Sequence, residues 1–428
     1  MSDVATSKND KAWEALFTKY DILHAIDVAN QFVISADQIR EFREPRLMTK
    51  FDHTVNLPQL FAKNKLSILP VSRGDYMIAP FHAYKKFEDK DTAVSNFSLP
   101  AHLQSLDANN IPSEAIAINC ALASGILSDF LDEECLYSTV SGRMGSDRFD
   151  FDIENLRTDA IMPVHVINSQ IEIDAALEGV RSLAILEAKR DLSEDFLIRQ
   201  LYYPFRVWSN RISKCVRPVF LVYSNGIFNL YEYQFSNKLL YNSLELIQQR
   251  NYSIESIEIE LSDLKNVLHQ VVPVEEPRIA FPQADKFERI INLCELLQMR
   301  ELSRDEITEE YAFDVRQTDY YSSAARYLNL VDKKYKSGVS VYGLSNTGRK
   351  VMALSYKKRQ LAFCNQILQH KVFFDTFIAC LKAGKMPDLS SIIKIMKSDG
   401  LYKVSSESTY DRRASTINSW LNWILGLL

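Results

Sequence analysis

Two short apolar runs near the middle of the chain predict neighbouring β-strands. Ile171 to Asp174 and Leu183 to Leu186 have the length and composition of strands. Residues 176–181 between them contain a glycine, as a hairpin connection requires. The triplet Glu187-Ala188-Lys189 ends the second run. Because side chains alternate between the two faces of a strand, its glutamate and lysine share one face and its alanine points into the layer behind.

The charged residues at the ends of these runs predict a site for a divalent cation. Asp174 ends the first run, and Glu187 and Lys189 end the second. Mg²⁺ prefers oxygen ligands and typically takes one or two protein carboxylates, with waters and phosphate oxygens as the rest. We therefore expect Asp174 and Glu187 to bind Mg²⁺. Lys189 is expected to orient or deprotonate an attacking water and to offset charge on a phosphate. The alternative is a solvated ion pair, worth about 0 to 1 kcal/mol.

The flanking patterns predict the other elements of this domain. Ser193-Glu194-Asp195 has the pattern of a helix N-cap followed by acids, and predicts a helix to about Trp208. The remaining predictions are a helix over Ser113 to Leu131, strands over Leu136 to Met144 and Phe149 to Ile153, and a hairpin of Val219 to Tyr223 with Phe228 to Phe235. Helix, strands with the acids, helix and strands is the order of the PD-(D/E)xK nuclease core.

Several blocks of this stretch resemble the catalytic domain of type II restriction endonucleases. They are Ser141-Gly142-Arg143-Met144, Gln170-Ile171-Glu172-Ile173-Asp174, Glu187-Ala188-Lys189 and Arg199-Gln200-Leu201-Tyr202-Tyr203-Pro204. The resemblance implies that Asp174, Glu187 and Lys189 are the catalytic residues. In one departure, no proline precedes Asp174. Gln200 and Tyr203 also resemble the glutamine-tyrosine helix motif of RecB-like nucleases, with a spacing one residue short.

Four further residues are candidates near this site. Glu172 shares the face of Asp174 and is either a third acid of the site or structural. Gln200 faces either the site or solvent. Arg143 and Arg148 flank the predicted turn at residues 145–147 and either contact DNA phosphate or are solvated.

The region after residue 280 predicts a winged-helix domain over residues 281–350. Amphipathic helices are expected over Ala284 to Gln298 and Thr318 to Leu328, and Ser303 to Glu306 is a capping box that begins a helix between them. A basic turn over residues 333–338 followed by Val339 to Leu344 predicts the wing. The block Arg316 to Leu330 also resembles C-terminal domains of restriction endonucleases. Candidate DNA contacts are the outward positions Arg316, Gln317, Tyr320, Ser322, Ser323 and Arg326, with Lys333 and Lys334 of the turn.

Residues 351–428 predict a second helix-turn-helix or winged-helix-like domain. Its expected helices are Gln360 to Lys382, Asp388 to Lys397 and Ser408 to Ile424. The last carries Arg412 and Arg413, which are further candidates for DNA contact. The alternative is that both domains contact protein rather than DNA.

Residues 1–100 predict a small α+β unit. Expected helices are Lys11 to Phe17, Asp21 to Phe32 and Ala36 to Phe42. Leu57 to Lys63 then leads into Ser67 to Val71 and Tyr76 to Ala79, which flank a turn at residues 73–75. Asn56-Leu57-Pro58 and residues 65–70 resemble the amino-terminal region of the same endonuclease group. Residues 83–112 have the polar, proline-punctuated composition of a linker into the nuclease domain, which we place at 101–280. The sequence thus predicts a mixed α+β fold.

The distribution of charge favours DNA binding by the C-terminal end. The chain of 428 residues has a net charge of −5. Residues 321–428 hold 17 Lys and Arg against 6 Asp and Glu, which leaves −16 for the rest. Neutralising phosphate supplies most non-specific DNA affinity, so the basic end is the expected DNA anchor. The alternative is an ordinary solvated surface.

Composition argues against several other classes of protein. The six cysteines show no Cys-x-x-Cys spacing and the seven histidines form no cluster in the sequence, which disfavours zinc sites, disulfides and histidine-metal nucleases. No apolar run approaches 20 residues and the N-terminus has no signal-peptide pattern, so we expect a cytoplasmic protein with no membrane contact. No P-loop or S-adenosylmethionine motif is present.

The sequence therefore favours a Mg²⁺-dependent type II restriction endonuclease that cleaves double-stranded DNA at a short site. One active site per chain favours a homodimer or sequential nicking, and a separate DNA methyltransferase would have to protect host DNA. Three alternatives remain open: a modification-dependent nuclease, a repair or junction nuclease that reads DNA shape, and a non-catalytic DNA-binding regulator that retains the nuclease fold.

Overall fold

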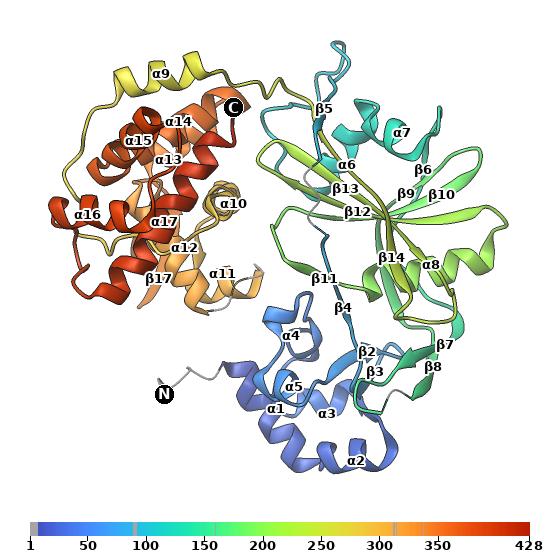
Figure 1. Cartoon of the computed structure of the whole chain (residues 1–428). Coiled ribbons are helices and arrows are strands. Elements are labelled where there is room, and N and C mark those ends of the chain that lie inside the picture. The colour runs from blue at the N-terminus through green and yellow to red at the C-terminus, as the bar shows by residue number, and fades with distance from the viewer. Residues whose placement is uncertain (1–6, 89–91, 159, 311–312, 314, 337) are drawn as a thin grey trace.

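The computed structural model describes residues 7–88, 92–158, 160–310, 313, 315–336 and 338–428. Figure 1 shows three parts: an N-terminal unit at the bottom, a region built on a large sheet at the right, and a mostly helical C-terminal lobe at the left. The fold is mixed α+β, as predicted from the sequence. None of the helices in the described ranges has the length and apolarity needed to cross a membrane.

The N-terminal unit packs five helices against a small antiparallel sheet with strand order β1-β3-β2. Its elements are α1 (Lys8–Lys19), α2 (Ile22–Ala29), β1 (Phe32–Ser35), α3 (Ala36–Arg40), α4 (Pro45–Thr49), a 3-10 turn (Thr54–Asn56), α5 (Gln59–Lys63), β2 (Ser67–Pro70) and β3 (Asp75–Ala79). Trp13, Phe17 and Phe61 meet edge to face in its core. The helix predicted over Asp21 to Phe32 is too long, because Asn30 takes a left-handed conformation and Phe32 begins β1.

A seven-stranded mixed sheet forms the centre of the molecule, with strand order β5-β14-β13-β12-β10-β9-β6. One hydrophobic cluster covers the face with α6 and α7, and another covers the opposite face with α8, β7 and β8. The elements are β4 (Tyr84–Lys86), β5 (Val94–Asn96), α6 (Glu114–Ala123), α7 (Ile126–Leu131), β6 (Tyr137–Gly145), β7 (Arg148–Glu154), β8 (Ile161–Ile167), β9 (Gln170–Glu178), β10 (Ser182–Lys189), β11 (Asp195–Leu197), α8 (Arg199–Arg211), β12 (Cys215–Ser224), β13 (Ile227–Phe235) and β14 (Leu244–Ser253).

Both predicted hairpins of this sheet are confirmed. β9 and β10 pair antiparallel, as do β12 and β13. Asn225 and Gly226 connect the second pair with φ angles of 51° and 79°, the left-handed conformation of a type I′ turn. α8 connects β10 to β12, which run parallel.

Three local predictions in this region are wrong for tertiary reasons. Ser193 does not cap a helix: residues 195–197 form β11, which pairs with β4, and α8 begins only at Arg199. β7 pairs with β8 rather than with β6. The expected linker over residues 83–112 contributes β4 and β5, and β5 joins the edge of the large sheet. In the first and third cases, pairing with a distant strand outweighs the local sequence preference.

The C-terminal lobe combines nine helices with a three-stranded sheet of order β15-β17-β16 over the ranges described. Its elements are α9 (Leu261–Gln270), α10 (Phe287–Met299), β15 (Leu302–Ser303), α11 (Arg304–Glu310), α12 (Val315–Tyr327), β16 (Val331–Lys336), β17 (Val339–Leu344), α13 (Asn346–Met352), α14 (Tyr356–Leu368), α15 (Lys371–Ala383), α16 (Leu389–Asp399) and α17 (Glu407–Leu425). The capping box is confirmed, since the Ser303 hydroxyl accepts from the Glu306 amide and the Glu306 carboxylate accepts from the Ser303 amide.

One hydrophobic cluster extends through the lobe from Leu264 to Ile424. It joins the two predicted C-terminal domains in a single core and reaches back before residue 281 to α9. Residues 351–428 contain helices only, so they form no second wing. The single helix predicted over Gln360 to Lys382 is wrong, because His370 is the N-cap of a new helix and stacks on Tyr327 with 4.2 Å between ring centroids.

Candidate active site

The site forms where β9 and β10 separate at one end of their hairpin. The antiparallel register between them ends at the pair Leu186 and Ala175. Just beyond this pair, a side chain replaces the backbone ladder: the Ala188 amide donates to Oδ2 of Asp174 at 2.8 Å. β10 remains paired with β12 up to Lys189. Asp174 and the end of β10 therefore face a common space. β10 is held in place there by its pairing with β12.

Glu187, Lys189 and Gln200 contact one another at this point. Lys189 Nζ lies 2.5 Å from Oε1 of Glu187, and Gln200 Nε2 donates to the same oxygen at 2.6 Å. Ala188 is fully buried in the cluster on the other face of the sheet, as the strand alternation predicts. Of the two orientations considered for Gln200, the structure has the one facing the site. The side chains of Glu187 and Lys189 are only 10% and 17% exposed, so the alternative of a solvated surface pair is wrong.

Glu114, at the start of α6, is a third acid near the site that the sequence analysis missed. Burial raises its pKa, Lys189 opposes the rise, and the negative charge of Asp174 adds to it. The side chain is therefore close enough to both residues to interact with their charges. Its position in a helix far upstream of the hairpin gave no local spacing signal, although the Ser113 N-cap that fixes this helix start is visible in the sequence.

The charges of these groups are strongly coupled. Burial raises the pKa of Glu187 to about 7; Lys189 opposes the rise, and Asp174 and Glu114 add to it. Burial alone would lower the pKa of Lys189, but the three carboxylates outweigh it and hold that pKa above its usual range. Lys189 is thus an ammonium ion at neutral pH. With all four groups ionised, the site has two negative charges in excess, which favours a divalent cation.

The carboxylates of Asp174 and Glu187 fit a Mg²⁺ ion whose other ligands would come from water and substrate. Oδ1 of Asp174 and Oε2 of Glu187 have no hydrogen-bond partner among the described residues and remain available to a metal. Over the part of the chain described, no three His, Cys, Asp or Glu side chains are grouped closely enough to hold a metal by themselves. The protein usually supplies one or two carboxylates to a magnesium site, and waters and phosphate oxygens supply the other ligands.

The other candidates on the strands lie outside this group. Glu172 pairs with Arg143 at 3.2 Å, and both side chains are more than half exposed. A surface pair of this kind is worth little, and its partner is on β6 rather than in the site. Arg148, at the start of β7, is exposed. Arg143 and Arg148 stay predicted DNA contacts.

The segment that follows Lys189 is held by both other parts of the molecule. His53 of the N-terminal unit lies 3.3 Å from Oδ2 of Asp191 and 3.6 Å from Oδ1 of Asp195. Burial alone would lower the pKa of His53, but these two carboxylates outweigh it and raise the pKa to about 10. From the C-terminal lobe, Asn292 of α10 donates to the Arg190 carbonyl at 2.6 Å and accepts from the Leu192 amide at 3.1 Å.

The predicted DNA contacts of α12 differ in exposure. Arg316 and Tyr320 are exposed, and Gln317, Ser323 and Arg326 are partly buried. Ser322 is only 1% exposed, and its hydroxyl donates to the Asp319 carbonyl at 3.3 Å. The expectation that Ser322 faces outward is wrong, because the buried face of α12 is wider than the spacing of its large apolar residues suggests.

The remaining basic candidates are distributed over the wing strands and α17. Lys333 lies over the rings of Tyr335 and Tyr342, and Lys334 pairs with Glu301 at 3.2 Å. Arg412 is exposed and its neighbour Arg413 is partly buried. Burial lowers the pKa of Arg413, Arg412 lowers it further, and Tyr320 of α12 opposes both. α12 and α17 therefore approach one another, which the sequence did not indicate.

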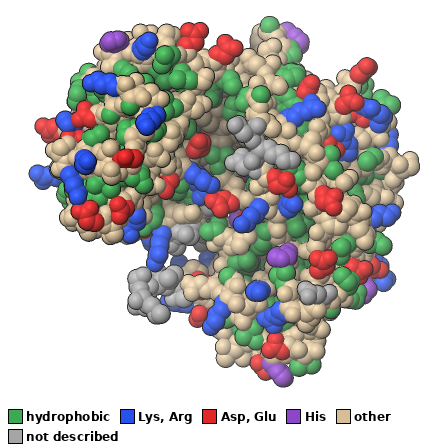
Figure 2. Space-filling model, in the orientation of Figure 1, with side chains coloured by type: hydrophobic (Ala, Val, Ile, Leu, Met, Phe, Trp, Pro, Cys, Tyr) green, Lys and Arg blue, Asp and Glu red, His purple; other side chains and the backbone are tan. Residues whose placement is uncertain are grey.

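Lys and Arg side chains are mixed with acidic ones over the face in Figure 2, and some lie at the edges of the hollow between the C-terminal lobe and the rest of the molecule.

Three family models match consecutive stretches of the chain. They are the domains of unknown function DUF6996 over residues 10–78, DUF6997 over residues 79–253 and DUF7226 over residues 289–428. No curated protein and no solved structure matches the chain.

Proposed function

We propose that the protein is a Mg²⁺-dependent, sequence-specific deoxyribonuclease of the type II restriction class with a PD-(D/E)xK core. The observation that carries this proposal is the group of Asp174, Glu187 and Lys189 at the point where β9 and β10 separate, with Glu187 buried and the other two partly buried. Buried charges are costly unless they are paired or bind a metal. An excess of carboxylate at this position is therefore better explained by a cation site than by a structural role.

Each residue has a distinct task in this proposal. Asp174 and Glu187 hold the metal, which polarises the scissile phosphate and activates water when bound. Lys189, charged at neutral pH, offsets the negative charge that develops on the phosphate. Gln200 fixes the orientation of the Glu187 carboxylate through its 2.6 Å hydrogen bond. Glu114 increases the negative charge of the site without contacting the metal.

The C-terminal lobe is proposed to bind double-stranded DNA through a winged helix. The order α10, α11, α12, β16, β17 with β15 completing the sheet matches that topology, and α12 is the helix that would enter the major groove. Arg316, Tyr320 and Arg326 are the contacts proposed on α12, and Lys333 and Lys334 those proposed on the wing. A homodimer would bring a second active site to the other strand. A separate methyltransferase would protect host DNA.

One experiment separates this proposal from the alternatives. Methylated genomic DNA, unmethylated genomic DNA and synthetic branched DNA are digested with the purified protein in Mg²⁺ or in EDTA, and the ends are sequenced. Discrete ends from unmethylated DNA in Mg²⁺ support restriction. Cutting only of methylated DNA supports a modification-dependent enzyme, and cutting only of branched substrates supports a structure-specific nuclease. DNA binding without Mg²⁺-dependent cutting of any substrate overturns the nuclease proposal in favour of a regulator.

A further inference from the structure

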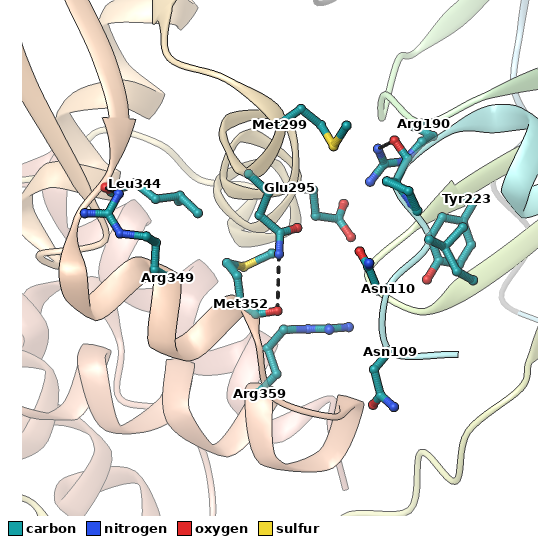
Figure 3. A pocket seen from close by; sticks show the side chains of 13 residues that line it. Asn109, Asn110, Arg190, Tyr223, Glu295, Met299, Leu344, Arg349, Met352 and Arg359 are labelled. Atoms are coloured by element: carbon teal, nitrogen blue, oxygen red, sulfur yellow. Dashed lines mark hydrogen bonds between the residues drawn. The ribbon is translucent and has the colours of Figure 1, made fainter. Parts of the chain in front are cut away.

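A cavity of about 260 Å³ lies between the large sheet and the C-terminal lobe (Figure 3). Arg190 and Tyr223 line it from the ends of β10 and β12, and Asn110 lines it from the segment before α6. On the opposite side, Gln298 of α10 and Arg359 of α14 complete the wall. Gln298 donates to the Met352 carbonyl at 3.3 Å, the dashed line in Figure 3.

Two arginines in the wall have unused donors. Arg359 is only 6% exposed, and its Nε has no hydrogen-bond partner. The Nε of Arg190 is also buried without a partner. Each guanidinium makes one hydrogen bond to a backbone carbonyl, Arg190 to Pro112 and Arg359 to Leu354. Among the residues that the structure describes, neither has a carboxylate within ion-pair distance.

The one carboxylate in the wall is committed elsewhere. Glu295 accepts hydrogen bonds from the Ser224 hydroxyl at 2.7 Å, the Asn225 amide at 2.8 Å and Asn292 at 3.1 Å. Its charge is thus held at the junction of β12 and α10. The cavity keeps a positive excess, and a buried guanidinium without a partner is unfavourable until an anion enters.

The rest of the lining suits a nucleotide. Guanidinium groups bind phosphate through paired N–H donors. The amides of Asn109, Asn110 and Gln298 offer both donors and acceptors for the edge of a base. Tyr223 and Met352 add apolar surface for its face. One water needs about 10 to 15 Å³ of cavity volume measured in this way, so the cavity of about 260 Å³ has room for more than a single phosphate group.

We propose that this cavity binds one nucleotide, with its phosphate on Arg190 and Arg359 and its base against the amides and Tyr223. The nucleotide has two possible sources with the same chemistry: a free mononucleotide, or a nucleotide of a DNA strand turned out of the stack. The proposal does not depend on nuclease activity, because none of these residues binds the proposed metal.

The test measures binding to the full-length protein in EDTA, where cleavage cannot occur. Deoxynucleoside 5′-monophosphates are titrated by calorimetry, and duplexes with a single 2-aminopurine are titrated by fluorescence. Arg359→Gln and Arg190→Gln should weaken binding in one of the two arms by about 10- to 100-fold, the range for a lost charge-assisted hydrogen bond. The control is Arg250→Gln, which changes an exposed arginine of β14 that pairs with Asp129 of α7, and it should leave binding unchanged.

The titration that is weakened by the substitutions identifies the source of the nucleotide. Weakened mononucleotide binding indicates a free ligand, and a lost 2-aminopurine signal with DNA indicates a nucleotide of the strand. Removing an unpaired buried charge should not lower the melting temperature of the ligand-free protein. Because the two arginines lie on different elements, a folding defect in one variant leaves the other to decide. Binding that is the same as wild type in both arms for the folded variants overturns the proposal.

Discussion

Two sites of opposite charge lie on either side of the peptide bond between Lys189 and Arg190. Lys189 belongs to a site where three carboxylates surround one ammonium. Arg190 belongs to a cavity where two guanidinium groups have no carboxylate partner among the described residues. Both sites are largely buried, so the low local dielectric strengthens whichever charge is in excess. One strand end thus borders an excess of negative charge, proposed to hold a cation, and an excess of positive charge, proposed to hold an anion. Each proposal predicts the effects of a different set of substitutions.

Among substitutions outside the two proposed metal ligands, the largest effect should come from removing the Lys189 ammonium of the acidic site. Lys189→Ala should lower the single-turnover cleavage rate by about 10²- to 10⁴-fold, because the charge on the phosphate is no longer offset. DNA affinity should change little, since it rests on contacts elsewhere. Lys214→Ala, at a lysine paired with Glu178 on the surface of the same sheet, is the matched control. Equal rates for Lys189→Ala and the wild type contradict this role.

The segment after Lys189 must stay in place for both sites to keep their geometry, and His53 contacts it at Asp191 and Asp195. His53→Gln leaves Asp191 and Asp195 buried without their partner and should lower the free energy of unfolding by about 3 to 5 kcal/mol near neutral pH. Denaturant unfolding measures this change. His165→Gln is the control, because His165 pairs with Asp150 at the exposed surface of β7 and β8.

The same histidine gives a pH dependence with a defined sign. The pKa of His53 is raised in the folded protein from 6.5 to about 10. Its contribution to stability is therefore complete below pH 6.5 and is lost as the pH rises through 10. The difference in unfolding free energy between wild type and His53→Gln should shrink over that range. A difference that grows with pH contradicts the assignment of a charged His53.

Glu114 tests whether the negative excess of the acidic site matters beyond the two metal ligands. Glu114→Gln should raise the Mg²⁺ concentration needed for half-maximal cleavage, or lower the rate, by about 10- to 100-fold, as for other residues that act through a ligand. The measurement is a Mg²⁺ titration of single-turnover cleavage. The control is Glu134→Gln, on an exposed loop. Identical titrations for Glu114→Gln and the wild type would exclude Glu114 from the site.

The smallest effects are expected for the proposed DNA contacts of α12 and the wing, which belong to neither site. Arg326→Ala should cost about 1 to 3 kcal/mol of binding on cognate DNA and little on random DNA if Arg326 reads a base. Lys333→Ala on the wing should weaken both about equally through a lost phosphate contact. Binding titrations at fixed salt distinguish the two. Equal losses on both DNAs for Arg326→Ala would assign Arg326 to the phosphates.

Sequence reasoning located the acidic site because its key residues lie within one hairpin. Strand alternation alone placed Glu187 and Lys189 on one face and Ala188 on the other, and the structure confirms this. The arginine cavity has no such signal. Its wall comes from the ends of β10 and β12, the segment before α6, and α10, α13, α14 and the end of β17 in the C-terminal lobe, so no local spacing relates its residues.

The predicted boundaries of helices and strands are wrong where distant contacts outweigh the local sequence preference. Ser193-Glu194-Asp195 has the pattern of a helix start, yet Asp195 accepts the Thr54 amide at 3.1 Å and β11 pairs with β4. The break between α14 and α15 is set by His370 stacking on Tyr327. In both places, a partner more than forty residues away decides the backbone.

The central claim is that the carboxylates at the end of the β9 and β10 hairpin hold a catalytic metal. The most direct test compares DNA cleavage by wild type, Asp174→Asn, Glu187→Gln and the surface control Glu178→Gln in Mg²⁺ and in EDTA, with DNA binding measured in parallel. We expect the wild type and the control to cut only in Mg²⁺, and Asp174→Asn and Glu187→Gln to bind DNA without cutting it. Cleavage by both site variants at the wild-type rate would contradict the claim.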